Sequence, residues 1–203
     1  MNKDELYRDL EQYFLEKGIS EGSFKEFSEQ RKISRTSLNY YFKNKDYIYI
    51  KILSKILKDF EKKFFVIIND EKVSYYERID ILLDMYFNIT KKNIKLYPYI
   101  QHLNEIEKKL KNKKDANADE VIEIIKKICD NFIDVTNKEI EDGNIIINYP
   151  KNYLFLIIST CLFPFTTPYI IEAVINISME EFYEKHYEYM KYILLKEIET
   201  LSK

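Results

Sequence analysis

Residues 23–45, SFKEFSEQRKISRTSLNYYFKNK, decide the fold of this chain. Ser23 is a favourable N-cap residue, and Glu26 three positions later completes a capping-box pattern at the start of a short helix. Ser34 is a second N-cap and predicts a second helix over residues 35–42, with a turn between the two helices. The stretch therefore predicts a helix-turn-helix, a motif whose second helix enters a DNA groove.

The second of these helices has one apolar and one polar face. Leu38 and Phe42 lie four positions apart and share the inward face. The outward side chains supply a guanidinium, hydroxyls, an amide and a phenol, which are groups that read base edges and hold phosphates. We expect the base-reading surface to comprise Arg35, Thr36, Ser37, Asn39 and Tyr40. The alternative is a plain helical hairpin, which gives no reason for basic and hydroxyl residues to share one exposed run.

The motif resembles the N-terminal signature of the tetracycline-repressor (TetR) family of bacterial transcriptional regulators. The residues in register with that signature are Ser23, Glu26, Phe27, Ser28, Ile33, Ser34, Ser37, Leu38, Tyr41, Phe42, Lys45 and Asp46. The resemblance implies a three-helix DNA-binding head at residues 1–46, in which a helix over residues 4–17 packs behind the motif. It implies a helical ligand-binding and dimerisation body at residues 47–203.

Four further positions are expected to bind DNA. Ser34, the N-cap of the second motif helix, is one of them. Ser23 and Lys45 are expected to hold the DNA backbone, because they lie at helix starts, where free backbone amides attract phosphate. The resemblance implies that the hydroxyl of Tyr41 also contacts a phosphate.

The turn of the motif departs from the family signature. Lys32 stands where the family has a glycine, and Arg31 stands where it has an alanine. A non-glycine residue at positive φ costs about 1 kcal/mol, so we expect a tilted or differently shaped turn. Asn39 replaces a frequent tyrosine and presents an amide in its place.

The composition indicates a globular, all-α protein. Of 203 residues, 46% are hydrophobic and 33% are charged, which excludes a disordered chain. Only 3 Gly and 4 Pro leave few turns and favour long helices. The net charge is −2, but residues 31–63 carry ten basic and only three acidic side chains, whereas residues 1–30 carry four and eight. Neutralising phosphates requires such a local basic patch rather than a basic protein.

Helical periodicity continues through the rest of the chain. A long helix from Lys45 to about residue 67 has apolar residues at every fourth position, and the resemblance makes it the link between head and body. The remaining segments are a helix after the Ser74–Glu77 capping box, helices at 98–106 and 119–142, a last helix after Ser178, a lysine-rich loop at 108–115 and an extended linker at 145–147.

Two segments near the carboxyl end predict assembly. Residues 153–163 are apolar on nearly every side, and such a helix must be covered all round. Residues 180–201 carry a long apolar stripe that includes Leu194. We expect a symmetric homodimer through these two segments, with Leu194 in the seam. The order of the helices is similar to the carboxyl half of TetR-type regulators, and the dimer would bind a palindromic DNA operator.

The sequence contains no pattern typical of catalysis or metal binding. There are two histidines, no Cys–His spacing typical of a metal site, and too few glycines for a phosphate loop. Cys129 and Cys161 suit the core of a reduced protein. We expect no enzyme activity, no metal and no cofactor. The first ten residues lack an apolar signal, and prolines interrupt residues 154–175, so we expect a cytoplasmic protein without a membrane span.

The body offers apolar and aromatic candidates for a small-molecule site. They are Tyr86, Phe87, Tyr99, His102, Cys129, Phe132, Phe155 and Thr160. An apolar or aromatic ligand suits such a lining, and the alternative is that these residues fill the core. We expect a repressor that is released from DNA by this ligand. The alternative is a helical ligand- or protein-interaction module whose helix-turn-helix does not bind DNA, and salt dependence of DNA binding distinguishes the two.

Overall fold

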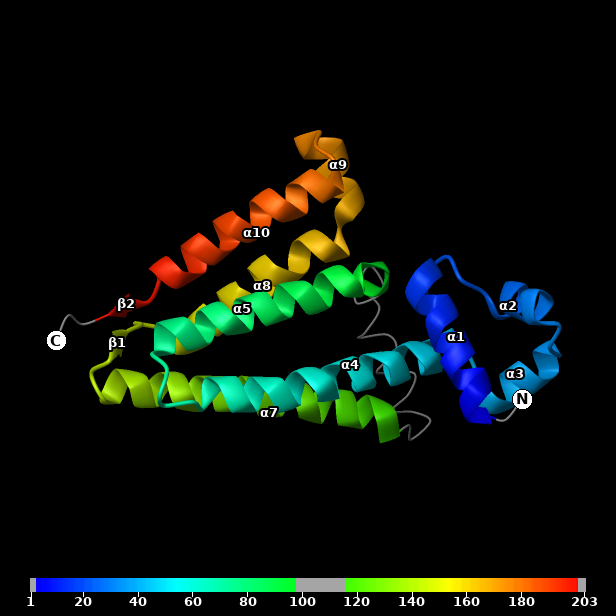
Figure 1. Cartoon of the computed structure of the whole chain (residues 1–203), viewed down its shortest axis with the longest axis horizontal. Coiled ribbons are helices and arrows are strands. Elements are labelled where there is room, and N and C mark those ends of the chain that lie inside the picture. The colour runs from blue at the N-terminus through cyan, green and yellow to red at the C-terminus, as the bar shows by residue number, and fades with distance from the viewer. Residues whose placement is uncertain (1–2, 98–115, 201–203) are drawn as a thin grey trace. The chain divides into compact units, whose positions relative to one another are not determined.

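The structure, a computed structural model, describes residues 3–97 and 116–200. Within these ranges the regular secondary structure is helical except for one pair of two-residue strands (Figure 1). The elements are α1 (Lys3–Lys17), α2 (Phe24–Arg31), α3 (Arg35–Phe42), α4 (Lys45–Ile68), α5 (Tyr75–Lys92), α7 (Ala116–Glu141), β1 (Ile145–Ile146), α8 (Pro150–Thr166), α9 (Pro168–Ile175), α10 (Met179–Lys196) and β2 (Glu199–Thr200). The predicted all-α fold is confirmed, whereas the helix expected at 98–106 and the loop at 108–115 lie outside the described residues.

The chain divides into two compact units. One contains the described residues within 1–57 and 93–122, and the other contains those within 58–92 and 123–203. The helices α4 and α7 therefore contribute to both units.

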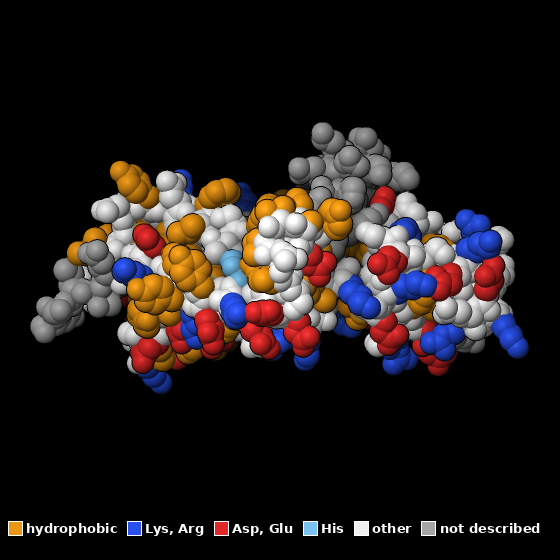
Figure 2. Space-filling model, turned by 90° about the horizontal axis from the view of Figure 1, so that it is seen from above, with side chains coloured by type: hydrophobic (Ala, Val, Ile, Leu, Met, Phe, Trp, Pro, Cys, Tyr) orange, Lys and Arg blue, Asp and Glu red, His pale blue; other side chains and the backbone are white. Residues whose placement is uncertain are grey.

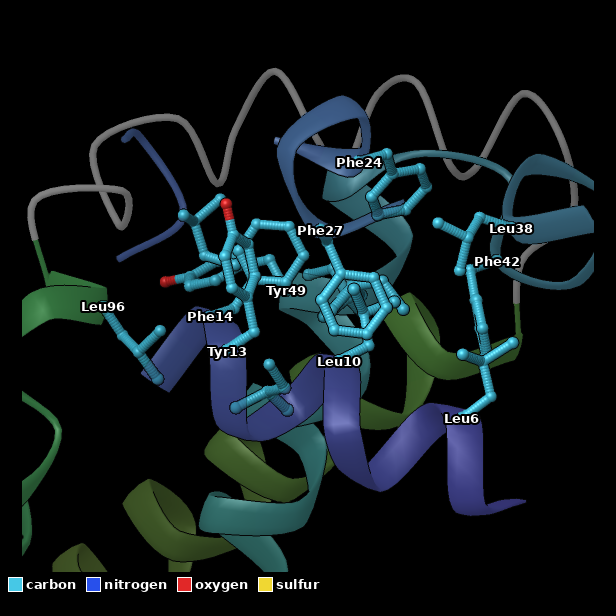
Figure 3. Close-up of a cluster of buried hydrophobic side chains, with 14 of the residues drawn as sticks. Leu6, Leu10, Tyr13, Phe14, Phe24, Phe27, Leu38, Phe42, Tyr49 and Leu96 are labelled. Carbon is cyan, nitrogen blue, oxygen red and sulfur yellow. The ribbon is translucent and has the colours of Figure 1, made fainter. Parts of the chain in front are cut away.

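The first unit is built on α1, as the periodicity of that helix predicts. Leu6, Leu10 and Phe14 of α1 are buried against apolar residues of α2, α3 and α4 (Figure 3). Gly18 ends α1 in the left-handed region with φ of +88°, and its N–H donates to the carbonyl of Phe14. The first helix thus packs behind the helix-turn-helix.

Capping residues set the starts of several helices where the sequence predicts them. The Asn44 side chain accepts from the Tyr47 N–H at 2.9 Å and opens α4. Ser74 and Glu77 form both hydrogen bonds of a capping box at the start of α5. Ser178 accepts from the Glu181 N–H at 3.3 Å at the start of α10.

The second unit packs α10 against α5 and α8. Phe64, Ile79, Phe132 and Leu194 belong to its buried apolar cluster. Leu194 is fully buried within the single chain, so the expectation that it lies in a seam between two subunits is wrong. The stripe on the last helix has two apolar sides, and Leu194 is on the side that faces the core of its own subunit.

A buried ion pair ties four segments of this unit together. The Arg78 side chain is 3% exposed, donates to the Ile68 carbonyl at 2.8 Å and forms an ion pair with Glu139. Glu139 also accepts from the Asn144 amide at 2.8 Å. The end of α4, the start of α5, the end of α7 and the chain before β1 therefore share one polar network.

The two strands correct two expectations. Residues 145–147 are expected to be an extended linker, whereas Ile145 and Ile146 form a strand that pairs antiparallel with Thr200 and Glu199. The last helix ends at Lys196 rather than continuing to residue 201. The backbone of residues 145–146 obtains its hydrogen bonds from a segment far away in sequence, which local patterns do not reveal.

Helix α8 continues past Pro164, one of the prolines expected to interrupt residues 154–175. A proline at position 164 cannot donate to the carbonyl of Thr160, and this carbonyl accepts instead from His186 Nε2 at 3.1 Å. The change of direction comes at Thr167, after which Pro168 opens α9. Among the described residues no single helix is long and apolar enough to cross a membrane, although α8 and α9, bent by 80°, reach that length and hydropathy together.

Candidate nucleic-acid interface

The start of α2 is fixed by a chain of hydrogen bonds that runs through Tyr13. Ser23 caps the helix, because its hydroxyl accepts from the Glu26 N–H at 3.1 Å. The Glu26 carboxylate does not complete the expected capping box. Instead the Ser23 N–H donates to the Tyr13 hydroxyl at 3.0 Å, and that hydroxyl donates to Glu26 at 2.8 Å. Tyr13 therefore joins the two halves of the box and ties α2 to α1.

The carboxylate of Glu26 also forms an ion pair with Lys17 of α1. The hydrogen bonds from Lys17 and from Tyr13 lower the pKa of Glu26. The ion pair raises the pKa of Lys17 in turn. Both side chains are substantially exposed, so the pair orients the helix more than it stabilises it.

The turn keeps a left-handed residue although that residue is a lysine. Lys32 has φ of 54° and ψ of 41°, and its N–H points at the carbonyls of Ser28 and Glu29. The Ile33 N–H also donates to the Ser28 carbonyl at 2.9 Å. The expected adjustment of the turn is therefore not seen at this residue, which accepts a strain of about 1 kcal/mol.

Helix α3 presents its polar face to solvent, as the sequence predicts. Leu38 and Phe42 are fully buried. Arg35, Thr36, Asn39 and Tyr40 are exposed, and Ser37 is half-buried. Tyr40 is 81% exposed and meets the ring of Tyr41 edge-on, with 5.3 Å between the ring centres. Arg35 has no ion-pair partner among the described residues, so its guanidinium is available to a ligand.

Two further residues expected to bind DNA are Ser34 before α3 and Tyr41 within it. Ser34 occupies the N-cap position of α3, but its hydroxyl makes no capping hydrogen bond. The hydroxyl and the first amides of α3 therefore remain available for an anion. Tyr41 is 40% exposed.

Lys45 has partners within the protein. Its ammonium donates to the carbonyls of Ile19 at 2.8 Å, Gly22 at 3.0 Å and Ser20 at 3.4 Å. A contact between this ammonium and a DNA phosphate stays a prediction, and it competes with these three carbonyls.

The candidate ligand-binding residues of the second unit are scattered. Phe87 stacks on Tyr187 with 4.1 Å between ring centres, and Phe132 is buried beside Tyr153. Tyr86, Cys129 and Thr160 are half-buried, and burial raises the pKa of the Cys129 thiol. Phe155 is 71% exposed on α8, and Tyr99 and His102 lie outside the described residues.

Two cavities of this unit are lined by other residues. One, of about 490 Å³, lies between the α4–α5 loop, the start of α5 and the end of α7. The other, of about 270 Å³, lies between residues 146–156 and Glu197. Neither is lined by any of the candidate residues, so the effector site stays a prediction.

Helices α8, α9 and α10 leave a large apolar surface uncovered. Figure 2 shows apolar side chains gathered over α9 and along α10 on one face of the molecule. The exposed residues are Phe155, Leu156, Ile158 and Phe163 of α8, Tyr169, Ile170, Val174 and Ile175 of α9, and Tyr189 and Tyr192 of α10. We call these ten residues the apolar patch. The expectation that one side of residues 153–163 stays uncovered within a single chain is met by its four α8 members.

Comparisons with known proteins identify the fold. No family model matches the sequence, and no curated protein matches it. Among solved structures, the chain is similar to the ketosteroid transcriptional regulator KstR2 of Mycobacterium tuberculosis, at a TM-score of 0.64 and 16% identity, covering 98% of this chain and 95% of that one. It is similar to a TetR/AcrR-family transcriptional regulator from Thermobifida fusca, at a TM-score of 0.61 and 16% identity, covering 93% and 96%.

A third similar structure carries a ligand. It is the transcriptional regulator FadR from Bacillus subtilis in complex with stearoyl-CoA, at a TM-score of 0.61 and 15% identity, covering 93% of this chain and 97% of that one. All three alignments span nearly the whole of both chains, and none depends on the helix-turn-helix alone. The chain therefore has the fold of the TetR/AcrR-family transcriptional regulators, with an N-terminal helix-turn-helix followed by a helical body.

Proposed function

We propose that this protein is a ligand-responsive transcriptional regulator that binds a palindromic DNA operator as a homodimer and acts as a repressor. The observation that carries this proposal is the exposed polar face of α3, held by a buried apolar face and a capped α2. A helical interaction module would not require a guanidinium, an amide, hydroxyls and a phenol to share one unpaired surface.

In this proposal α3 reads bases in the major groove. Arg35, Thr36, Ser37, Asn39 and Tyr40 form the reading surface, and Ser23, Ser34 and Tyr41 hold phosphates beside it. Residues 1–46 supply these contacts, and residues 47–203 supply dimerisation and ligand binding.

The test of the DNA contacts is substitution of Arg35. Arg35→Ala should weaken binding to a selected operator by about 1–3 kcal/mol and relax the choice of one base pair, if the guanidinium reads guanine. An equal loss of affinity for all duplexes would show that Arg35 contacts a phosphate rather than a base. Unchanged binding to operator and random DNA would remove Arg35 from the interface.

The apolar patch supports the homodimer. It carries Phe155 and Ile158 on α8 and Tyr189 and Tyr192 on α10, within the two segments expected to pair. A two-fold dimer would use the same patch on both subunits and place two copies of α3 about one helical turn of DNA apart.

The effector is proposed to be a small molecule with a large apolar part. The aromatic and aliphatic content of the second unit supports this class. One similar structure is named a ketosteroid transcriptional regulator, and another is in complex with stearoyl-CoA. The residues proposed to line the site are Tyr86, Phe87, Tyr99, His102, Cys129, Phe132 and Thr160, whereas the exposed Phe155 is assigned to the apolar patch.

Regulation requires that the effector bind one conformation of the protein better than another. The effector could favour a tilt of α4 at which the distance between the two α3 helices of the dimer no longer matches the operator half-sites. DNA binding then weakens by the ratio of the effector affinities for the two conformations. By reciprocity, operator DNA must weaken effector binding by the same factor. Calorimetric titration of a candidate effector into free and operator-bound protein tests this, because equal affinities would exclude that compound as the inducer.

A further inference from the structure

Lys45, the first residue of α4, binds the loop before α2 through its side chain. The ammonium of a lysine has three donors, and each of three loop carbonyls lies within hydrogen-bond distance of Nζ: those of Ile19, Ser20 and Gly22. The side chain is half-buried in this position. All donors of Lys45 are therefore directed at the protein.

The loop that Lys45 holds is closely packed. Gly18 opens it in the left-handed conformation, and the Gly22 N–H donates back to the Gly18 carbonyl at 2.9 Å. A Cβ on Gly22 would come within 2.7 Å of the Phe14 ring, so this backbone lies directly on the core. The loop has little freedom to follow a lysine that turns away toward DNA.

The same loop ends at the N-cap of α2. Gly22 offers its carbonyl to Lys45, and the next residue, Ser23, donates its N–H to Tyr13. The start of α2 is thus held from one side by α4 and from the other side by α1.

We propose that Lys45 is a positioning residue of the DNA-binding surface: its ammonium clamps the loop of residues 18–22 and thereby fixes Ser23 and the start of α2, and it does not neutralise a phosphate. This rests on the proposed DNA-binding function. It differs from the expectation drawn from the sequence, in which Lys45 at the start of a helix contacts the DNA backbone.

The two roles differ in the salt dependence of DNA binding. Each phosphate that a side chain neutralises in B-DNA contributes about 0.9 to the slope of log affinity against log salt concentration. The substitution Lys45→Met removes the charge and the donors while keeping a similar apolar stem. We expect the variant to bind roughly tenfold more weakly at every salt concentration, since one charge-assisted set of hydrogen bonds is lost, with the wild-type slope.

A second readout needs no DNA. Amide hydrogen exchange in the free protein should become faster at Gly22 and Ser23 in Lys45→Met, because the loop loses its clamp. Lys25→Met, an exposed lysine on α2, is the matched control and should leave these amides unchanged. If Lys45→Met does not fold, Lys45→Gln removes the charge while keeping a donor, and its salt slope decides: the wild-type slope supports the proposal, and a slope lower by about one contradicts it.

A slope reduced by about one, with unchanged exchange at Gly22 and Ser23, would overturn the proposal and return Lys45 to the phosphate backbone. If the wild-type protein binds no duplex at all, the proposed function fails. The exchange measurement still decides whether Lys45 is a clamp.

Discussion

The apolar patch allows a quantitative prediction for Phe155. This side chain is 71% exposed in the single chain. A large aromatic side chain buries about 150–250 Å², so a two-fold contact over Phe155 would remove about 140 Å² more from water on each subunit. At about 25 cal/mol per Å² this corresponds to about 3.5 kcal/mol per subunit, or about 7 kcal/mol for the two copies.

Association does not deliver the whole of this free energy, because side chains become ordered and part of the patch stays wet. We take about half, which predicts that Phe155→Glu weakens the dimer about 300-fold. The measurement is sedimentation velocity over a concentration series, with circular dichroism to show that the variant is folded. The matched control is Val66→Glu on α4, since Val66 is also apolar and 74% exposed but is not part of the patch.

A dimerisation constant of Phe155→Glu equal to that of the wild type, or equal dissociation of the dimer by Val66→Glu, would show that the apolar patch is not the dimer contact. Leu194→Glu is unsuitable for this test. Leu194 is fully buried in its own subunit, so a carboxylate at this position would unfold the subunit itself.

Three further predictions concern stability. Lys32→Gly should stabilise the protein by about 0.5 kcal/mol in chemical denaturation, because the relief of left-handed strain exceeds the added conformational entropy of the unfolded chain. Lys32→Ala should give no gain, and equal effects of the two substitutions would argue against strain at φ of 54°. Arg78→Met should cost about 3–5 kcal/mol in the same assay, since Glu139 remains buried without its cation, and Glu139→Gln in the same chain should recover most of it; a loss below about 1 kcal/mol would contradict the buried pair. Glu26→Gln should lower the melting temperature at pH 7, because the pKa of Glu26 is lowered in the folded protein and the ionised carboxylate stabilises it at pH values above the ordinary pKa of 4.5. This stability is lost as the pH falls below 4.5 and the carboxylate is protonated, so the difference from the wild type should vanish there, and a pH-independent difference would contradict the role of the charge.

The sequence predicts the local features of this fold well. The bounds of α3, the capping of α2 by Ser23, the Asn44 cap of α4 and the Ser74–Glu77 capping box depend on residues within four positions of one another. The buried and exposed faces of α3 follow from one helical period. For such features the local chemistry is the whole cause, so a single sequence is enough.

Contacts between distant residues explain what the sequence did not predict. Tyr13 enters the capping box from ten positions before Ser23, and Lys45 reaches a loop more than twenty positions away. Pairing of β1 with β2 joins residues more than fifty positions apart. The residues next to Tyr13, Lys45 or β1 in the sequence do not show whether the polar groups there bond to a distant segment or to water.

The sequence also does not show which side of an apolar helix faces the core of its own subunit. On α10 the sequence shows one long stripe, but Leu194 packs into its own subunit while Tyr189 and Tyr192 remain outside. Helical period gives the angle between these residues and not the direction in which the core lies.

The central claim, that the exposed face of α3 reads a DNA operator, is tested most directly by selecting bound duplexes from random DNA with the wild-type protein. We expect enrichment of a palindrome with half-sites about one helical turn apart, bound with an affinity that falls steeply as salt is added. Failure to enrich any sequence, together with binding to DNA that is weak and independent of salt, would contradict it.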